Sequence, residues 1–306
     1  MTTEQYFKNL TPPTRKVDVV LDTDAYNEID DQFAIAYLLR QPELFNVVGL
    51  TAAPFLNERS VSPLDGMEKS YTEILTLLEL MGLDDMKDKV YKGSADYLPD
   101  IKTPVESDAA DFLARLADDY CPENPLYVVA IGAITNVASA LLKNPAMKEN
   151  CVVVWLGGHA ENYPKAAVEF NMKQDIAAAR VVMGCGVPFV QLPCRGVVDH
   201  FATSRYELEH WLSGVSPLCD HLIGAAIAEA ESYAAGKPWT RVIWDVTAVA
   251  WLKNSDRRFM REKLIHSPIP EYDKQYAYDP TGHLIKYVYE INRDALFEDL
   301  FKVLKG

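Results

Sequence analysis

The chain has 306 residues, 49% of them hydrophobic, so it is long enough and apolar enough to bury a substantial core. Acidic residues outnumber basic ones by 44 to 30, and the formal charge of −14 argues against binding to nucleic acid or to an anionic membrane surface. The N-terminus is polar and no apolar run is long enough to cross a membrane, so we expect a cytoplasmic protein.

The first two thirds of the chain alternate between short β-branched runs and segments of helical periodicity. A strand over 17–21 precedes a helix that begins near Ile29. Strands over 45–51, 126–131 and 151–156 precede helices over 67–81, 135–142 and 175–183, and a fifth strand covers 187–192. This alternation predicts an α/β fold, a mostly parallel open sheet with helices on both faces.

After about Gly196 the pattern becomes mainly helical. Helices over 207–212, 221–235 and 245–252 are followed by a short strand over 284–288 and a terminal helix. No low-complexity linker interrupts the chain, so we expect a single domain over 1–306 with a helical C-terminal elaboration. Ligands of open parallel sheets bind beyond the carboxyl ends of the strands, which makes the residues after each strand the candidates for a site.

Five carboxylates crowd into ten residues where the first strand gives way to a helix. They belong to Asp22, Asp24, Glu28, Asp30 and Asp31. An N-cap at Asn27 would explain part of this acidity, because carboxylates near a helix N-terminus are favourable. It does not explain the three aspartates at 22, 24 and 31 together, since like charges this close raise one another's pKa unless a cation lies among them. The five cysteines form no Cys-x-x-Cys pair, so the cluster predicts a hard divalent cation on oxygen ligands.

This cluster resembles the calcium-binding opening of the inosine–uridine-type nucleoside hydrolases. Their usual form is Asp-x-Asp-Pro-Gly-x-Asp-Asp, and here the final Asp-Asp pair stands two residues later. Further segments resemble the family in the expected order: 131–136 its Thr-Gly-Pro-Leu-Thr-Asn turn, 169–171 its Glu-Phe-Asn motif and 245–248 its His-Asp-Pro-x-Ala helix start, with a Gly-Gly pair at 157–158. The resemblance extends over about 17–252 and implies a nucleoside hydrolase-like fold with a Rossmann-like core.

The resemblance also implies a function, which is calcium-dependent hydrolysis of the N-glycosidic bond of a ribonucleoside or related riboside. The calcium would be held by Asp24, Asp31, Asp245 and the carbonyl of Ile131, leaving coordination positions for water and the ribose 2′- and 3′-hydroxyls. Asp24 would also be the general base. The ribose-binding residues of the family fall here on Asp30, Asn57, Asn162, Glu169 and Asn171. By the same analogy we expect a small-molecule riboside as partner and a homodimer or homotetramer.

The sequence departs from the family where the departing base would be protonated. Many members carry a His before the C-terminal Asp, whereas this chain has Trp244, whose indole cannot deliver a proton at neutral pH. Either stacking on the aromatic ring activates the leaving group, or another acid serves, with His159 and then His200 as candidates, or the substrate differs. The longer loop near 54–62 departs too, and its Arg59 and the following Lys69 would add positive charge near the base or a 5′-substituent, or pair with carboxylates.

Two alternatives stay open at this stage. Asp22-Thr23-Asp24 after a strand also resembles the nucleophile motif of haloacid dehalogenase-like phosphohydrolases, although the later lysine and acidic pair of that family are not found. The other alternative is a calcium-dependent riboside-binding protein that is catalytically weak because it lacks the family His.

Overall fold

The computed structural model describes residues 1–306, and its central element is an eight-stranded sheet of order β3-β2-β1-β4-β5-β6-β12-β9. All neighbours in this sheet are parallel except β12 and β9 at one edge, which are antiparallel. The strands of the sheet are β1 (Val17–Thr23), β2 (Phe45–Ala52), β3 (Val90–Tyr91), β4 (Leu126–Ala130), β5 (Cys151–Leu156), β6 (Phe189–Leu192), β9 (Met260–His266) and β12 (Leu284–Ile291). Two small antiparallel pairs are separate from it: β7 (Ala202–Thr203) with β8 (Arg241–Val242), and β10 (Pro268–Pro270) with β11 (Tyr276–Tyr278).

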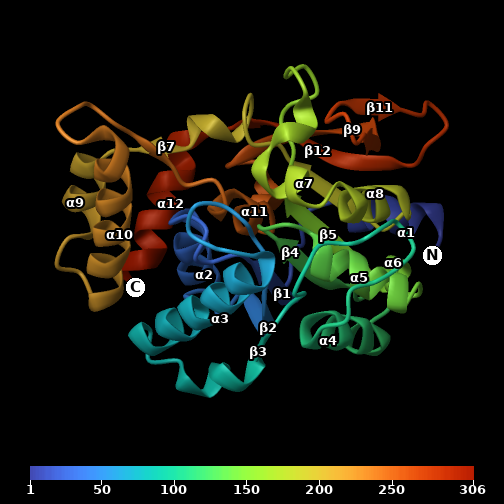
Figure 1. Ribbon diagram of the computed structural model, residues 1–306, viewed down its shortest axis with the longest axis horizontal. Coiled ribbons are helices and arrows are strands. Elements are labelled where there is room, and N and C mark those ends of the chain that lie inside the picture. The colour runs from blue at the N-terminus through green and yellow to red at the C-terminus, as the bar shows by residue number, and fades with distance from the viewer.

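Helices cover both faces of this sheet (Figure 1). One face carries α2 (Asp30–Leu39), α3 (Pro63–Leu80), α11 (Val246–Trp251) and α12 (Arg293–Lys305); the other carries α4 (Asp108–Leu116), α5 (Thr135–Lys143) and α8 (Ile176–Gly184). The remaining α-helices are α1 (Thr3–Asn9), α6 (Met147–Asn150), α7 (Phe170–Gln174), α9 (Arg205–Leu212) and α10 (Pro217–Ala234), with α9 and α10 at the left in Figure 1. No helix is both long and apolar enough to span a membrane.

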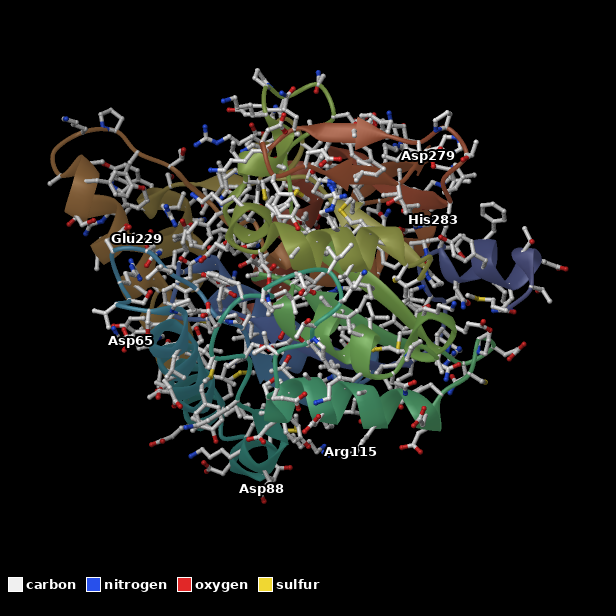
Figure 2. All side chains as sticks on the ribbon, turned by 45° about the vertical axis from the view of Figure 1, so that its right-hand side comes forward. Asp65, Asp88, Arg115, Glu229, Asp279 and His283 are labelled. Atoms are coloured by element: carbon white, nitrogen blue, oxygen red, sulfur yellow. The ribbon has the colours of Figure 1, made fainter.

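The alternation of side chains along the central strands divides the interior into two cores. In β5, Val152 and Val154 belong to the core beneath α2 and α11, whereas Val153 and Trp155 belong to the core beneath α5 and α8. Every residue of β4 and β5 is buried, because both faces of these strands are covered. Charged side chains such as Asp88, Arg115 and Asp279 are exposed and stand at the periphery (Figure 2).

The predicted α/β fold is confirmed, and each predicted strand of the parallel sheet is found within a few residues of its expected place. The C-terminal part holds more strands than expected, because β9 pairs with β12 at the edge of the main sheet and the small pairs β7–β8 and β10–β11 also lie there. The sequence of β9, MREKLIH, carries three charges and lies half in solvent, so it has no apolar run to reveal it. The N-cap considered at Asn27 is also not found, since α2 begins after Ile29 and no side chain caps it.

A buried carboxylate ties the C-terminal helix α12 to the rest of the fold. Asp299 is 9% exposed and accepts hydrogen bonds from the Tyr37 hydroxyl of α2 and from the Lys253 ammonium. Its other oxygen lies 2.9 Å from the Arg258 guanidinium. Burial lowers the pKa of Lys253, and the negative charge of Asp299 opposes that shift. The Asp299 carboxylate therefore compensates the Lys253 ammonium in the interior.

Replacing Asp299 should destabilise the protein strongly. In Asp299→Ala the Lys253 ammonium and the Tyr37 hydroxyl lose their buried acceptor, so we expect the free energy of unfolding to fall by about 3 kcal/mol. Urea unfolding followed by circular dichroism measures the change. Glu298→Ala, at an exposed position of the same helix, is the control and should change the free energy by less than about 0.5 kcal/mol. Equal effects of the two substitutions would contradict the anchoring role.

Candidate functional site

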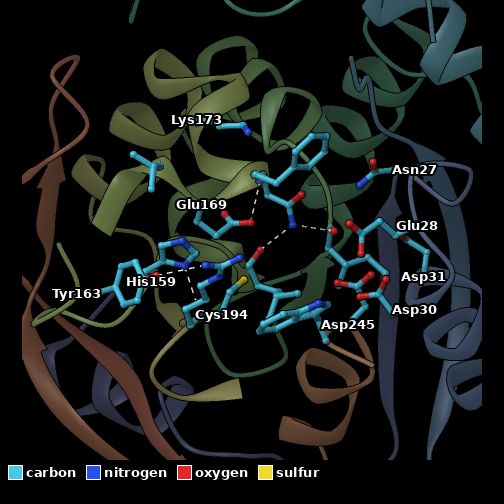
Figure 3. Close-up of a pocket in the computed structure, with 17 residues that line it drawn as sticks. Asn27, Glu28, Asp30, Asp31, His159, Tyr163, Glu169, Lys173, Cys194 and Asp245 are labelled. Carbon is cyan, nitrogen blue, oxygen red and sulfur yellow. Dashed lines mark hydrogen bonds between the residues drawn. The ribbon is translucent and has the colours of Figure 1, made fainter. Parts of the chain in front are cut away.

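The loops after β1, β4, β5 and β6 meet at the carboxyl end of the sheet and enclose a pocket of about 360 Å³. That volume is typical of small-molecule sites, and the position is the one expected for an open parallel sheet. Figure 3 shows the acidic residues Asp30, Asp31 and Asp245 on one side of the pocket and His159 and Tyr163 on the other. The pocket therefore has two chemically different sides.

Three carboxylates converge on the acidic side. Asp30 and Asp31 open α2, and Asp245 lies directly before α11, so two helix N-termini bring them together. One oxygen of each side chain lies within 4.8 Å of the others, and all three residues are at most 3% exposed. Asp24, from the end of β1, is fully buried beside them but does not belong to this group of three.

The acidic cluster lacks the partners that buried carboxylates normally have. Both oxygens of Asp24 and one oxygen of Asp30 are shielded from solvent and have no hydrogen-bond partner. Burial, together with the charges of Asp31 and Asp30, raises the pKa of Asp24 well above its usual value. Burial raises the pKa of Asp31 to about 7, although the Thr23 hydroxyl donates a hydrogen bond to it. Such a cluster is costly for the folded protein unless a cation compensates it.

The donor set fits a hard divalent cation. Closely spaced carboxylate oxygens with free lone pairs are the ligands that calcium and magnesium prefer. The carbonyl of Ile131 also lines the pocket and accepts one hydrogen bond, from the Asn171 amide at 2.9 Å, which leaves it a second lone pair. Asp31, Asp245 and Ile131 of the predicted ligand set thus face the pocket, and Asp30, predicted to bind ribose, offers the third carboxylate of the close group.

Glu169 and Asn171 form the floor between the two sides. The Glu169 carboxylate accepts three hydrogen bonds of 2.9 Å, from the backbone N–H groups of Gly158, Asn171 and Met172. Gly158 has φ of +77°, and a Cβ there would lie 1.9 Å from the Tyr276 hydroxyl oxygen, so only glycine permits this contact. The Asn171 amide donates to the carbonyls of Ile131 and Leu156. Both predicted polar groups are fixed in place by the backbone around them.

Two of the predicted ribose-binding residues do not line the pocket. The Asn57 amide instead donates to the side chain of Asn27, which does line it, at 2.6 Å. Asn162 is exposed, because a turn closed by the N–H of Tyr163 and the carbonyl of Ala160 directs it outward. Tyr163 lines the pocket in its place.

The candidate acids are unsuited to protonating a leaving group. His159 lines the pocket, but burial and the positive charges of Arg195 and Lys173 lower its pKa to about 4, so its ring is neutral at pH 7. Its Nδ1 accepts the backbone N–H of Arg195 at 3.3 Å. The side chain of His200 is 73% exposed and does not reach the pocket. Trp244 is half-buried and lines the pocket, as expected for a neighbour of Asp245.

Several residues of the site carry no recognisable signal in the sequence. Lys173 and Arg195 line the pocket, and Arg241 pairs with Glu28 on its acidic side at 2.9 Å. Arg241 and Glu28 are 213 residues apart, so no local pattern connects them. Arg241 also pairs with Glu229 of α10, which in turn holds the Arg59 guanidinium at 2.6 Å.

Comparison with known proteins places these features in context. A family model described as inosine-uridine preferring nucleoside hydrolase matches residues 19–278. A protein named "Probable uridine nucleosidase 2", from Arabidopsis thaliana, is 29% identical over 189 residues, which are 56% of this chain and 57% of that protein. The match thus spans little more than half the length of that relative.

Solved structures share the fold over nearly the whole chain. A purine-preferring ribonucleoside hydrolase from Gardnerella vaginalis has a TM-score of 0.76 and 20% identity, covering 94% of this chain and 98% of that one. A plant nucleoside hydrolase has a TM-score of 0.74 and 20% identity, covering 95% and 99%. At this identity the likeness is one of fold.

The raised pKa of Asp31 makes a prediction about stability and pH. The unfolded carboxyl titrates near its ordinary value of 3.8 and the folded one near 7, so the metal-free fold binds more protons than the unfolded chain between these values. Protonation of Asp31 therefore makes its full contribution to the free energy of unfolding below pH 4, and this contribution is lost as pH rises through about 7. With chelator present, we expect the free energy of unfolding to fall between pH 5 and pH 8, and Asp31→Asn to flatten that fall.

A hard divalent cation that binds the cluster should reverse the effect at pH 8, and calcium is the probe. We expect added calcium to raise the melting temperature of the wild type and to raise that of Asp31→Asn much less. Asp18→Asn, on the same strand but outside the cluster, should respond to calcium as the wild type does. An identical calcium response in all three proteins would place the cation elsewhere.

Proposed function

The chain belongs to the family of inosine-uridine preferring nucleoside hydrolases, and from this premise we propose that it cleaves the N-glycosidic bond of a ribonucleoside or related riboside with calcium as cofactor. The phosphohydrolase alternative does not agree with this membership. The observation that carries the proposal is the close group of buried carboxylates on one side of a pocket of small-molecule size. The names of the relatives include both a uridine nucleosidase and a purine-preferring enzyme, so the base is left open.

We assign the cation to Asp30, Asp31, Asp245 and the carbonyl of Ile131, with Asp24 adjoining them. When bound, calcium would supply positive charge that acidifies a water molecule and holds the vicinal hydroxyls of a ribose. Glu169 and Asn171 orient the sugar, because their positions are fixed by five hydrogen bonds to the backbone. Rigid polar groups of this kind reduce the entropy that must be lost when the sugar is positioned.

Asp24 is the proposed general base. It is fully buried and neither of its oxygens is occupied by a hydrogen bond, so both are free to accept a proton. Asp22 differs, since its Oδ1 accepts hydrogen bonds from Thr51 at 2.6 Å and Asn136 at 2.8 Å. We therefore assign Asp22 to holding the strand ends together and Asp24 to accepting the proton of the attacking water.

Neither His159 nor Trp244 can protonate the leaving group. His159 is neutral at pH 7, and the Trp244 indole has no proton to give at that pH. The face of the Trp244 ring offers stacking to a planar leaving group instead. Ribosides whose leaving groups are stable as anions should therefore be the better substrates.

The proposed reaction can be tested with a panel of ribonucleosides and p-nitrophenyl riboside, followed as release of free base or nitrophenolate. We expect cleavage with calcium and its loss on chelation, with recovery when calcium is restored. Asp24→Asn should lower kcat by about 10²- to 10⁴-fold, the usual contribution of a general base. Asp18→Asn is the matched control and should leave kcat within about twofold. Binding of ribosides without any turnover would instead support the alternative of a riboside-binding protein.

Because neither His159 nor Trp244 can act as an acid, kcat/KM should depend steeply on the pKa of the leaving group. The kcat/KM of the wild type should rise as the pKa of the leaving group falls, so p-nitrophenyl riboside should be a far better substrate than uridine or inosine. Trp244→His should reduce the ratio of kcat/KM for p-nitrophenyl riboside to that for uridine or inosine by about tenfold or more, because it places a titratable group beside Asp245. Trp244→Phe keeps an aromatic ring without a titratable group and should leave this ratio of kcat/KM values unchanged. If the wild type cleaves all these ribosides at similar rates, an acid is present and the assignment of Trp244 is wrong.

A further inference from the structure

Two cations line the side of the pocket that faces the acidic cluster. Lys173 follows Asn171 on α7, and Arg195 follows the buried Cys194 in the loop after β6. Figure 3 shows Lys173, His159 and Tyr163 on the side away from Asp30 and Asp245. Neither Lys173 nor Arg195 forms a salt bridge, although the protein carries a formal charge of −14.

Both cations are held by neutral aromatic groups. The Lys173 ammonium lies over the Phe170 ring, 5.1 Å from its centroid. The Arg195 guanidinium donates a hydrogen bond of 3.3 Å to the Tyr163 hydroxyl. Aromatic partners fix a cation in place without cancelling its charge, so the charge stays available to a ligand.

The cations around the acidic side are arranged differently. Arg241 pairs with Glu28, and Arg59 pairs with Glu229. Lys69 pairs with Asp65, so both Arg59 and Lys69 pair with carboxylates, which is one of the two roles that the sequence left open for them. The uncompensated positive charge of the pocket therefore comes from Lys173 and Arg195.

Glu169 and Asp199 carry negative charge on this side of the pocket, but neither forms a salt bridge with Lys173 or Arg195. Glu169 accepts three backbone N–H groups, which already stabilise its charge. Asp199 accepts the N–H of Gly196 at 3.0 Å through one oxygen, while its other oxygen has no hydrogen-bond partner, and its negative charge favours the charged form of Arg195 without a salt bridge between them. Burial is the main cause of the lowered pKa of His159, and the charges of Arg195 and Lys173 add to the shift while Asp199 opposes it, so both cations act on this side of the pocket.

We propose that the substrate is a riboside carrying an anionic substituent, which Lys173 and Arg195 bind while the ribose lies on the acidic side. This inference rests on the proposed function and names its substrate class. The opposed charges of the two sides orient the molecule, because its diol suits the acidic side and its anion suits the basic one. A phosphate on the ribose 5′-oxygen and a carboxylate on the base both have the required chemistry.

Paired substrates distinguish the two sources of the anion. The first pair is p-nitrophenyl riboside and its 5-phosphate, and the second is uridine and orotidine, which differ by a carboxylate on the base. We expect the anionic member of one pair to have the higher kcat/KM by about tenfold or more, because a charge-assisted contact typically contributes that much. Preference within the first pair identifies a 5′-phosphate, and preference within the second identifies a base carboxylate. The preference should weaken as salt is added, since both cations are exposed.

Variants test whether the two cations cause the preference. Lys173→Met and Arg195→Met retain the aliphatic packing and remove the charge, and each should lower the ratio of kcat/KM for the anionic member to that for the neutral one by about tenfold. Lys165→Met is the matched control, because this exposed lysine belongs to the loop between β5 and α7 and does not line the pocket. Its ratio should equal that of the wild type.

The outcomes separate this inference from the function on which it rests. Cleavage of neutral ribosides with no preference for either anionic member would overturn the inference and leave the proposed function standing. A preference that survives in the Lys173→Met, Arg195→Met double variant would also overturn it. If no riboside of either kind is cleaved, and ribose 5-phosphate binds no more tightly to the wild type than to the double variant in calorimetry, both proposals fail.

Discussion

The burial of several aspartates at one end of the sheet is the constraint on which this structure depends. Asp24, Asp30, Asp31 and Asp245 are almost inaccessible to solvent, and several of their oxygens have no partner. Isolated buried carboxylates lose hydration energy and repel one another, so each raises the pKa of the next. Four buried carboxylates in one place lower the stability of the metal-free fold, and the same concentration of negative charge attracts a cation strongly.

The rest of the fold makes that concentration of charge tolerable. Two separate apolar cores cover the faces of the sheet, so the stability of the fold does not depend on the packing at the strand ends. Arg241 adds a positive charge beside the cluster by pairing with Glu28, and its pairing with Glu229 connects the cluster to α10. Asp22 stands apart from the crowding, since Thr51 and Asn136 satisfy one of its oxygens. Within the cluster itself, the oxygens without a partner belong to Asp24 and Asp30.

The sequence predicts the features that neighbouring residues encode, and it does not predict those that depend on contacts between distant parts of the chain. The strand, the turn and the acidic start of α2 lie within fifteen residues, so the carboxylate cluster could be read directly, whereas Asp245 was reached through a resemblance. The edge strand β9 was missed because its exposed face carries charges. The pairing of Arg241 with Glu28 and the position of Arg195 beside Tyr163 depend on how distant loops meet, and no periodicity reports that. The turn that exposes Asn162 likewise depends on a backbone hydrogen bond that the family motif does not encode.

The two unusual features of the pocket, a Trp in place of the family His before Asp245 and two cations without a salt bridge, are physically connected. Without a proton donor, the developing charge on the leaving group must be stabilised by the substrate itself or by binding energy gained elsewhere on the molecule. Binding energy from a part of the substrate that does not react can be used to position the reacting atoms, provided that the contact is rigid. Lys173 and Arg195 are fixed by Phe170 and Tyr163, and Glu169 between the two sides is fixed by backbone N–H groups. An anion held there would fix the far end of the riboside, so that the bond to be broken lies beside Asp24, and the pocket would replace proton donation with precise positioning.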